Sequence, residues 1–423
     1  MQIRKVNPFQ PNSPVHPGMF VGRIEEVIKL ESILLQLCKG GKPVNFIITG
    51  ERGIGKTSLL KFLTWEAQGD IPVEKEKLSF LVVFTDISSS TSQIDLVKKI
   101  ELGLREKLHQ DKDVAEICKE IGDFITRFES DIIRYNKKDN LTSDEVYLEE
   151  YSYKLARLVE KLCGGSGKKG KYDGLLLLID EADNSTKELK LGSFFKLFLE
   201  RLQRQNCEKI IIGLAGLPDL LSILKESHPS SPRLFEPIKL NRLSTEEVNR
   251  VVDGCLEDAK KKNDHEISIT KGALNWLVRF SEGFPHFIQQ YGYSAFAYDK
   301  DWIIDEKDVT RSAMESGGAM EIIGDHYYKD AFYNQIRGEN CREVLRIMAD
   351  DLDGWVSRKK ILQQYKGKPA TLDSALRILR ERKIIIPKLG SRGMYRLEHK
   401  GFALWILYYT TPPKRLKNNN KGK

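Results

Sequence analysis

The chain has 423 residues, of which 40% are hydrophobic and 30% charged, and its formal net charge is +8. Because a single core rarely grows beyond about 250 to 300 residues, this length predicts two or three domains. The longest apolar runs, 175–179 and 402–409, are far shorter than the roughly 20 residues of a membrane-spanning helix. We therefore expect two core elements, a cytoplasmic protein and no membrane partner. The six cysteines show no CxxC or Cys/His pairing, which argues against a zinc site and a disulfide framework.

Charge is distributed unevenly along the chain. Residues 355–423 contain 18 Lys and Arg against three acidic residues, a net charge of +15. Residues 1–354 carry 50 Lys and Arg against 57 Asp and Glu, a net charge of −7. A strongly basic end predicts a polyanionic partner. The alternative is a solvated basic tail, but helical patterns accompany the charge.

The first half of the chain alternates short strands with helices. Residues 1–18, rich in Pro and Asn, predict an extended lead-in that wraps the next domain. A helical periodicity then places on one side the apolar residues Ile24, Val27, Ile28, Leu30 and Leu34. Apolar strands are expected at 45–49, 80–86, 174–180, 209–214 and 236–240. Such strands, separated by helical patterns, are typical of a parallel sheet buried on both faces.

The second half is helical. Ser244 and Glu247 fit a capping box that opens it. Helices are expected near 244–262, 269–281, 285–298 and 306–315. Three short helices and a hairpin-like segment then predict a winged helix-turn-helix. We expect disorder for the last ten or so residues.

A phosphate-binding motif follows the first expected strand. The pattern Gly50-x-x-x-x-Gly55-Lys56-Thr57 lies between a strand and a helix, as a P-loop requires. Backbone N–H groups would cradle the phosphates of ATP, Lys56 would reach the β- and γ-phosphates, and the Thr57 hydroxyl would ligate Mg²⁺. The alternative is a mere tight turn. The expected cofactor-binding residues here are Gly50, Glu51, Arg52, Gly53, Ile54, Gly55, Lys56, Thr57 and Ser58.

Acidic residues follow the third expected strand, in "LLLLIDEAD". Asp180 should emerge beside the P-loop, at the carboxyl edge of the sheet, and hold Mg²⁺. Glu181 follows directly and is the expected general base. The alternative for this pair is an acid that caps the next helix. For Asp183, capping and catalysis are equally open.

These motifs together resemble an AAA+ ATPase, closest to the branch of origin-recognition initiators and STAND-like ATPases. The resemblance covers about residues 17–410 and rests on "MFVGR", "GERGIGKTS", "LLLLIDEAD", "GLAGLPDL", "SPRLFEPIKLNRLS", "GFPHFIQ" and the winged helix. It implies an α/β P-loop core with a parallel sheet, a helical lid and a winged helix-turn-helix domain. The implied bounds are 19–243, 244–320 and 321–412, between the lead-in and a basic disordered tail at 413–423.

The resemblance also implies roles for residues outside the P-loop. Arg233 lies where the family places an arginine finger, which contacts the γ-phosphate held by a neighbouring subunit; covering the sheet edge is the alternative. A "FVGR" segment packs against adenine in the family, although a hydrophobic staple explains it equally simply. The residues concerned are Phe20, Val21, Gly22 and Arg23.

Two departures from the family pattern favour slow turnover, as in a switch. The fourth strand is followed by Gly213-Leu214-Ala215-Gly216, where the family usually has a polar sensor. In "GFPHF", Pro285 belongs to a segment that resembles the Gly-x-Pro motif of the STAND-like branch, and His286 stands where initiators usually carry a sensor arginine. A protonated His286 would contact phosphate; helix capping or packing is the alternative.

The expected DNA-binding surface lies in the winged helix. Leu372, Ala375, Leu376 and Leu379 should face its core, which leaves other residues of the same helix directed outward. Basic residues on either side would contact phosphates. A protein-docking winged helix is the alternative. The expected DNA-binding residues are Arg358, Lys359, Lys366, Lys368, Thr371, Ser374, Arg377 and Arg392.

The sequence thus predicts an ATP-hydrolysing, DNA-associated switch or assembly factor. Its expected partners are duplex DNA and further copies of itself, which would meet at the nucleotide interface. The alternative is a STAND-type signalling ATPase whose winged helix docks a protein effector. The "GFPHF" motif and the missing polar sensor support that alternative, but no sensing repeat array accompanies them.

Overall fold

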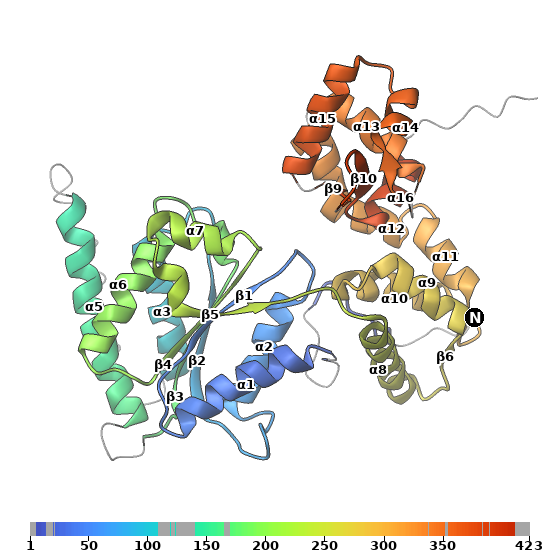
Figure 1. Ribbon diagram of the computed structural model, residues 1–423. Helices are drawn as coiled ribbons and strands as arrows, with labels where there is room; N and C mark the ends of the chain where they lie inside the picture. The colour runs from blue at the N-terminus through green and yellow to red at the C-terminus, as the bar shows by residue number, and fades with distance from the viewer. Residues whose placement is uncertain are drawn as a thin grey trace, which may run out of the picture. The chain divides into compact units, whose positions relative to one another are not determined.

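The structure, a computed structural model, divides the chain into two compact units (Figure 1). The core unit is Pro14–Asn241, and the C-terminal unit comprises Met1–Ser13 and Arg242–Lys423. The boundary lies two residues before the predicted end of the nucleotide-binding core. The residues described are 6–13, 20, 22–108, 119, 123, 140–164, 170–336, 338–351, 354–382, 384–388 and 390–410.

A parallel sheet forms the centre of the core unit, as predicted. Its strands are β1 Asn45–Thr49, β2 Phe80–Asp86, β3 Gly174–Asp180, β4 Ile210–Gly216 and β5 Phe235–Lys239. The spatial order is β2-β3-β4-β1-β5, so β1 lies between β4 and β5. Every residue of β3 and β4 is buried, which explains their continuous apolar sequences.

Helices cover both faces of this sheet (Figure 1). The helices and short helical turns of the core unit are α1 Ile24–Cys38, α2 Lys56–Gln68, α3 Gln93–Leu108, α5 Asn140–Cys163, η2 Ala182–Asn184, α6 Leu191–Arg204, α7 Leu220–Ser227 and η3 Ser231–Leu234. One face shares a hydrophobic core with α3, α5, α6 and α7, and α1 and α2 cover the other. The buried stripe of α1 starts at Leu30. Ile24 and Ile28 are 55% and 57% exposed, which corrects the predicted face, because a periodicity does not say how far a helix is covered.

The C-terminal unit begins with the predicted helices. They are α8 Thr245–Asn263, α9 Lys271–Ser281, α10 Pro285–Tyr298 and α11 Glu306–Met314, with short parallel strands β6 Ser268–Ile269 and β7 Ile303–Ile304. The capping box of Ser244 and Glu247 is confirmed.

Residues 6–13 lie on these helices, which corrects the prediction that the lead-in wraps the next domain. The amide of Gln10 donates to Gln289 Oε1 at 2.8 Å, and that of Val6 donates to Asn263 Oδ1 at 3.1 Å. Phe9 is fully buried against Gly292, where a Cβ would lie 2.4 Å from its ring. No local pattern in the segment encodes this distant docking site.

A winged helix follows, as predicted. Its elements are α13 Glu339–Ala349, β8 Val356–Ser357, α14 Arg358–Gln364, α15 Pro369–Glu381, β9 Ile385–Pro387 and β10 Met394–Leu397, with the antiparallel order β8-β10-β9. The connector before it contains α12 Ala319–Ile323 and the π-helices η4 Gly324–Tyr328 and η5 Ala331–Gln335. A further helix, α16 Lys400–Tyr409, contains the predicted apolar run and buries Phe402, Ala403, Trp405 and Ile406. The tail 413–423 lies outside the described residues.

A partly buried polar cluster joins the helical part of this unit to α16. Arg242 NH1 lies 3.2 Å from Glu282 Oε2, and Arg242 NH2 lies 3.1 Å from His399 Nδ1. The amide of Gly401 donates to Glu282 Oε1 at 2.7 Å. Burial, with the nearby Arg242, lowers the pKa of His399 to about 4, so its neutral ring accepts the bond.

Among the described residues, no helix has both the length and the apolar character that crossing a bilayer demands.

Candidate nucleotide site

The loop between β1 and α2 is shaped by its glycines. Gly53 and Gly55 have φ angles of 77° and 97°, a left-handed region that side chains disfavour. At Gly50, a Cβ would lie 2.8 Å from Ile54 Cγ2 and 3.1 Å from the Leu240 carbonyl oxygen. The three glycines therefore allow the backbone to fold tightly around the loop centre, as the P-loop prediction requires.

The start of α2 suits a bound anion. Gly55 is the N-cap residue, no side chain in the described structure caps this end, and the first turn has no acidic residue. The first-turn amides of Lys56, Thr57 and Ser58 therefore present donors together with the positive end of the helix dipole. This donor set and the glycine turn fit the phosphates of a nucleotide.

Lys56 brings its charge to the same loop. Its Nζ donates to the carbonyl oxygens of Gly50 at 2.8 Å and Glu51 at 3.0 Å. Burial lowers the pKa of Lys56, and the carboxylates of Asp183 and Asp180 oppose that shift. The ammonium group is thus held by backbone oxygens over the turn.

Asp180 and Thr57 meet at the carboxyl edge of the sheet. Thr57 Oγ1 donates to Asp180 Oδ2 at 2.5 Å, although the residues are 123 positions apart. Asp180 is 5% exposed, and its Oδ1 accepts a bond from the amide of Glu181 at 2.9 Å. A hydroxyl and a buried carboxylate are oxygen ligands of the kind that Mg²⁺ prefers, so these two residues fit the predicted metal site.

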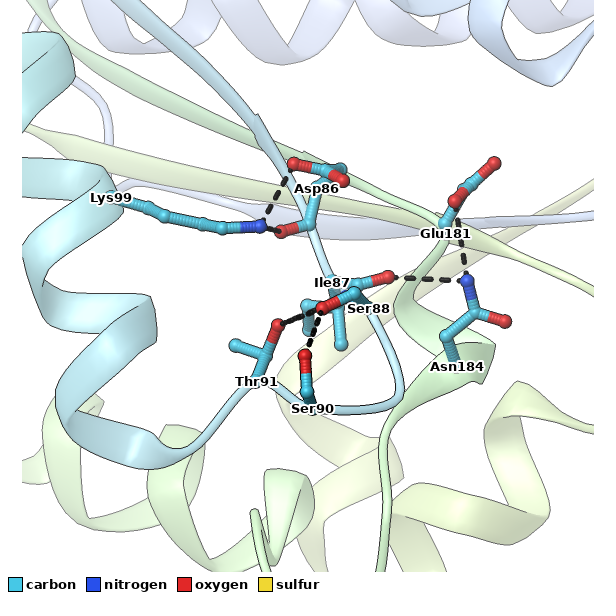
Figure 2. A network of polar contacts seen from close by, with 8 residues as sticks. All are labelled: Asp86, Ile87, Ser88, Ser90, Thr91, Lys99, Glu181 and Asn184. Carbon is cyan, nitrogen blue, oxygen red and sulfur yellow. Dashed lines mark hydrogen bonds and ion pairs between the residues drawn. The ribbon is translucent and has the colours of Figure 1, made fainter.

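Glu181 lies in a tight turn directly after β3 (Figure 2). Its φ angle is 51°, an uncommon left-handed conformation for a residue other than glycine, which costs on the order of 1 kcal/mol. Its Oε2 accepts a hydrogen bond from Asn184 Nδ2 at 3.2 Å. Sequence reasoning missed Asn184; the available signal was a polar residue three positions after the expected base.

Asp183 has a role that neither sequence alternative anticipated. Its Oδ1 accepts a bond from the amide of Leu217 at 2.9 Å, and a Cβ on Gly216 would lie 2.6 Å from the same oxygen. The N-cap residue of α6 is Lys190. Asp183 therefore ties the turn after β3 to the end of β4 and does not cap α6.

The segment that contains this site matches a known protein family. The family described as "AAA domain" matches residues 43–224, the segment from β1 to α7. Residues 43–224 thus match an AAA domain that begins at the strand before the P-loop. No curated protein matches the chain.

The fold extends beyond the AAA+ domain. The ORC2 protein of Aeropyrum pernix, in ADPNP and ADP complexes, is similar with a TM-score of 0.53 and 15% identity, over 92% of this chain and 93% of that chain. Cdc6p of Pyrobaculum aerophilum reaches 0.44 at 17% identity, over 94% of both chains. The ORC1 protein of Aeropyrum pernix in complex with DNA reaches 0.42 at 16% identity, over 95% of this chain and 94% of that one. The likeness to ORC2 indicates an origin-recognition type of fold.

The segment before α1 contacts the P-loop. Arg23 is buried, and its NH2 donates to the Ile54 carbonyl oxygen at 3.1 Å. The Phe20 ring stacks on Phe62 of α2 at 4.6 Å, so it is not a staple on α1. Gly22 precedes Arg23 with a φ angle of 85°. Val21 lies outside the described residues, and adenine contact stays a prediction for all four residues.

Arg233 lies away from the P-loop of its own chain. It is exposed in η3, just before β5, and the start of β5 pairs with the start of β1 through Phe235 and Asn45. Because the P-loop follows the other end of β1, Arg233 is at the opposite edge of the sheet. Its predicted role therefore requires a neighbouring subunit and stays a prediction.

His286 belongs to the C-terminal unit. Pro285 is the first residue of α10, and the His286 ring lies 5.4 Å from the ring of Tyr327. This position agrees with the packing alternative, and phosphate contact stays a prediction.

The predicted DNA-binding residues divide into exposed and ion-paired groups. Lys359, Lys366, Lys368 and Arg392 are exposed. Arg358 instead makes a two-point ion pair with Asp373 at 2.6 and 2.8 Å, and Arg377 pairs with Glu381 at 3.0 Å. Thr371 Oγ1 and Ser374 Oγ donate to the carbonyl oxygens of Lys368 and Ala370, at the start of α15. The outward face of α15 was predicted correctly, but its charge is partly neutralised.

Proposed function

We propose that the chain binds ATP with Mg²⁺, hydrolyses it slowly and acts as a nucleotide-dependent, DNA-associated switch or assembly factor. The observation that carries this proposal is the meeting of Thr57 with Asp180, beside Lys56 and Glu181. ORC2, with which the chain shares its fold, was obtained with ADPNP and ADP. The nucleotides in the ORC2 complexes support the proposal that this chain binds a nucleotide.

The proposed chemistry assigns a task to each side chain. Amides of the P-loop bind the phosphates, and Lys56 contacts the β- and γ-phosphates. Asp180 and Thr57 would hold Mg²⁺, which neutralises charge on the phosphates when it is bound. Glu181 takes a proton from the attacking water, whose oxygen bonds to the γ-phosphorus as the bond to the leaving ADP oxygen breaks. The products are ADP and phosphate.

Slow turnover is proposed from what surrounds the site. All residues of β4 are buried, and Gly213 and Gly216 leave space for Phe46 and Asp183 where the family usually has a polar sensor. Arg233 is at the other edge of the sheet, so its guanidinium does not reach phosphates bound by its own chain. Self-association would supply it at the nucleotide interface.

DNA association is proposed from the exposed cations of the winged helix. Lys366 and Lys368 lie just before α15, and Arg392 lies in the turn between β9 and β10. A duplex would meet these cations chiefly through its phosphates, with strong dependence on salt. The ion pairs of Arg358 and Arg377 favour the alternative, a STAND-type signalling ATPase whose winged helix docks a protein effector.

ATP turnover with and without duplex DNA, at two salt concentrations, tests the proposal. We expect slow basal turnover and stimulation by DNA that weakens with salt. Glu181→Gln should keep ATP binding and reduce turnover at least tenfold. Glu188→Gln, at an exposed position of the same loop, is the matched control and should match the unmodified protein.

Each result has a definite meaning. Unchanged turnover in Glu181→Gln would remove Glu181 as the base. An absence of stimulation by DNA, with tightly retained nucleotide, would contradict the DNA-associated function and favour the signalling ATPase.

A further inference from the structure

The amide of Asn184 makes two hydrogen bonds of different kinds (Figure 2). Nδ2 donates to Glu181 Oε2 at 3.2 Å and to the carbonyl oxygen of Ile87 at 3.2 Å. Ile87 follows directly after β2, whereas Glu181 follows directly after β3. The Asn184 side chain thus links the expected general base, which follows β3, to the end of the neighbouring strand β2.

The Ile87 carbonyl is a rigid anchor. Ile87 is fully buried, and its amide donates to the carbonyl oxygen of Asp180 at 3.1 Å, which continues the pairing of β2 with β3. Ser88 follows in a closed turn, where its amide donates to Thr91 Oγ1 at 2.9 Å. Just before Ile87, Lys99 Nζ bonds both the carbonyl oxygen and a carboxylate oxygen of Asp86, at 2.9 and 3.0 Å. The carbonyl oxygen that accepts the bond from Asn184 is therefore fixed to β3, the strand that ends at Asp180.

Glu181 needs such an anchor because it is exposed. An exposed glutamate turns about three side-chain bonds, and few of its rotamers place an oxygen where a water can be deprotonated. The bond from Asn184 holds Oε2, and among the described residues no hydrogen bond or ion pair engages Oε1. One oxygen is fixed and the other is available to accept a proton.

The turn itself brings Asn184 within reach. The Asn184 amide donates to the carbonyl oxygen of Glu181 at 3.0 Å, so the two residues close one helical turn. An aspartate would have the same shape but no N–H to donate, and its charge would repel Glu181. The geometry suits an amide at this position.

We propose that Asn184 is a positioning residue for hydrolysis, which fixes the Glu181 carboxylate against the end of β2. The inference rests on the proposed ATPase function. Asn184 acts through Glu181 and touches no reacting atom. Its loss should therefore lower kcat for ATP without changing nucleotide binding.

Steady-state kinetics of the full chain test this role. In Asn184→Ala we expect kcat to fall about three- to tenfold, with KM for ATP within about twofold, because only the fraction of correctly placed Glu181 changes. Asn184→Asp, which keeps the size of the side chain, should lose at least as much. Ser90→Ala removes a hydroxyl of the neighbouring turn, which lies 3.2 Å from Ser88 Oγ, and is the matched control with unchanged kcat.

A double-mutant cycle separates positioning from a purely structural role. Combined with Glu181→Gln, the Asn184→Ala change should have little further effect on turnover, since no base remains to be positioned. A full additional loss in the double variant would overturn the proposal, as would an unchanged or raised kcat in both Asn184 variants. If the unmodified protein turns over no faster than Glu181→Gln, the ATPase function itself fails, and the role of Asn184 fails with it.

Discussion

Charged side chains have different surroundings in the nucleotide site and on the basic face of the winged helix. In the core unit, Lys56 is held by backbone oxygens of the P-loop, and Asp180 is buried against Thr57. In the winged helix, Arg358 and Arg377 pair with neighbouring acids, and other predicted cations extend into solvent. The first arrangement is preorganised for one ligand, whereas the second supplies a diffuse and partly neutralised field.

A net charge does not show which charged side chains are already paired. The net charge of +15 over residues 355–423 includes Arg358 and Arg377, yet two of the three acidic residues in that range, Asp373 and Glu381, neutralise them. Exposed pairs contribute little to stability, but they reduce the local potential that a polyanion meets. A motif with fixed spacing constrains geometry; a surplus of basic residues does not.

Replacing Lys56 should give the largest effect, because the nucleotide site depends on single side chains. We expect Lys56→Ala to lower ATP affinity on the order of 100-fold, since it removes the charge held over the loop. Isothermal titration with ATP and Mg²⁺ measures it. Lys61→Ala, farther along α2, is the control with unchanged affinity. Retained affinity in Lys56→Ala would contradict the preorganised site.

Neutralising exposed cations of the winged helix should give a moderate effect. For the triple variant Lys366→Gln, Lys368→Gln and Arg392→Gln we expect about tenfold weaker binding of duplex DNA at low salt. The slope of log affinity against log salt should also fall by up to about three, near one per phosphate contact. Fluorescence anisotropy at several salt concentrations measures both.

A paired control sharpens the contrast within the winged helix. The double variant Arg358→Gln with Asp373→Asn keeps the net charge and removes one ion pair, so DNA affinity should stay within about twofold. An effect as large as that of the triple variant would mean that paired cations also contact DNA.

The last expected effect is on stability and concerns the helix that carries the P-loop. Glu66 of α2 is 2% exposed, and burial, with a hydrogen bond that protonated Glu66 donates to Glu31, raises its pKa to about 8. Between pH 4.5 and 8 the folded state keeps a proton that the unfolded state releases, so the free energy of unfolding falls as pH rises. Glu66→Gln should flatten this decline and stabilise the protein at pH 8 by on the order of 2 kcal/mol.

Thermal unfolding of the Glu66 variant from pH 5 to 9 measures this dependence. Glu25→Gln, at an exposed position of α1, is the control and should keep the decline. A parallel decline in Glu66→Gln would show that Glu66 ionises normally in the folded state.

Much of the fold was predictable because its signals are local. The predicted strands lie within two residues of β1 to β5, since buried parallel strands are apolar throughout and bounded by turns. The capping box at Ser244 and the outward face of α15 followed from short spacings. The exposure of Ile24 and the docking of Phe9 on α10 were not predictable, because they depend on surfaces far away in the chain.

By itself, the sequence determined the P-loop turn and the alternation of strands and helices, and it predicted which residues carry the chemistry. Glycine conformations and apolar runs act over a few residues, so the sequence encodes them directly. Only the tertiary structure decided that Thr57 meets Asp180, that Asn184 anchors Glu181 to the end of β2, and that Asp373 neutralises Arg358. Those contacts depend on strand order and helix packing, which join residues that no local spacing relates.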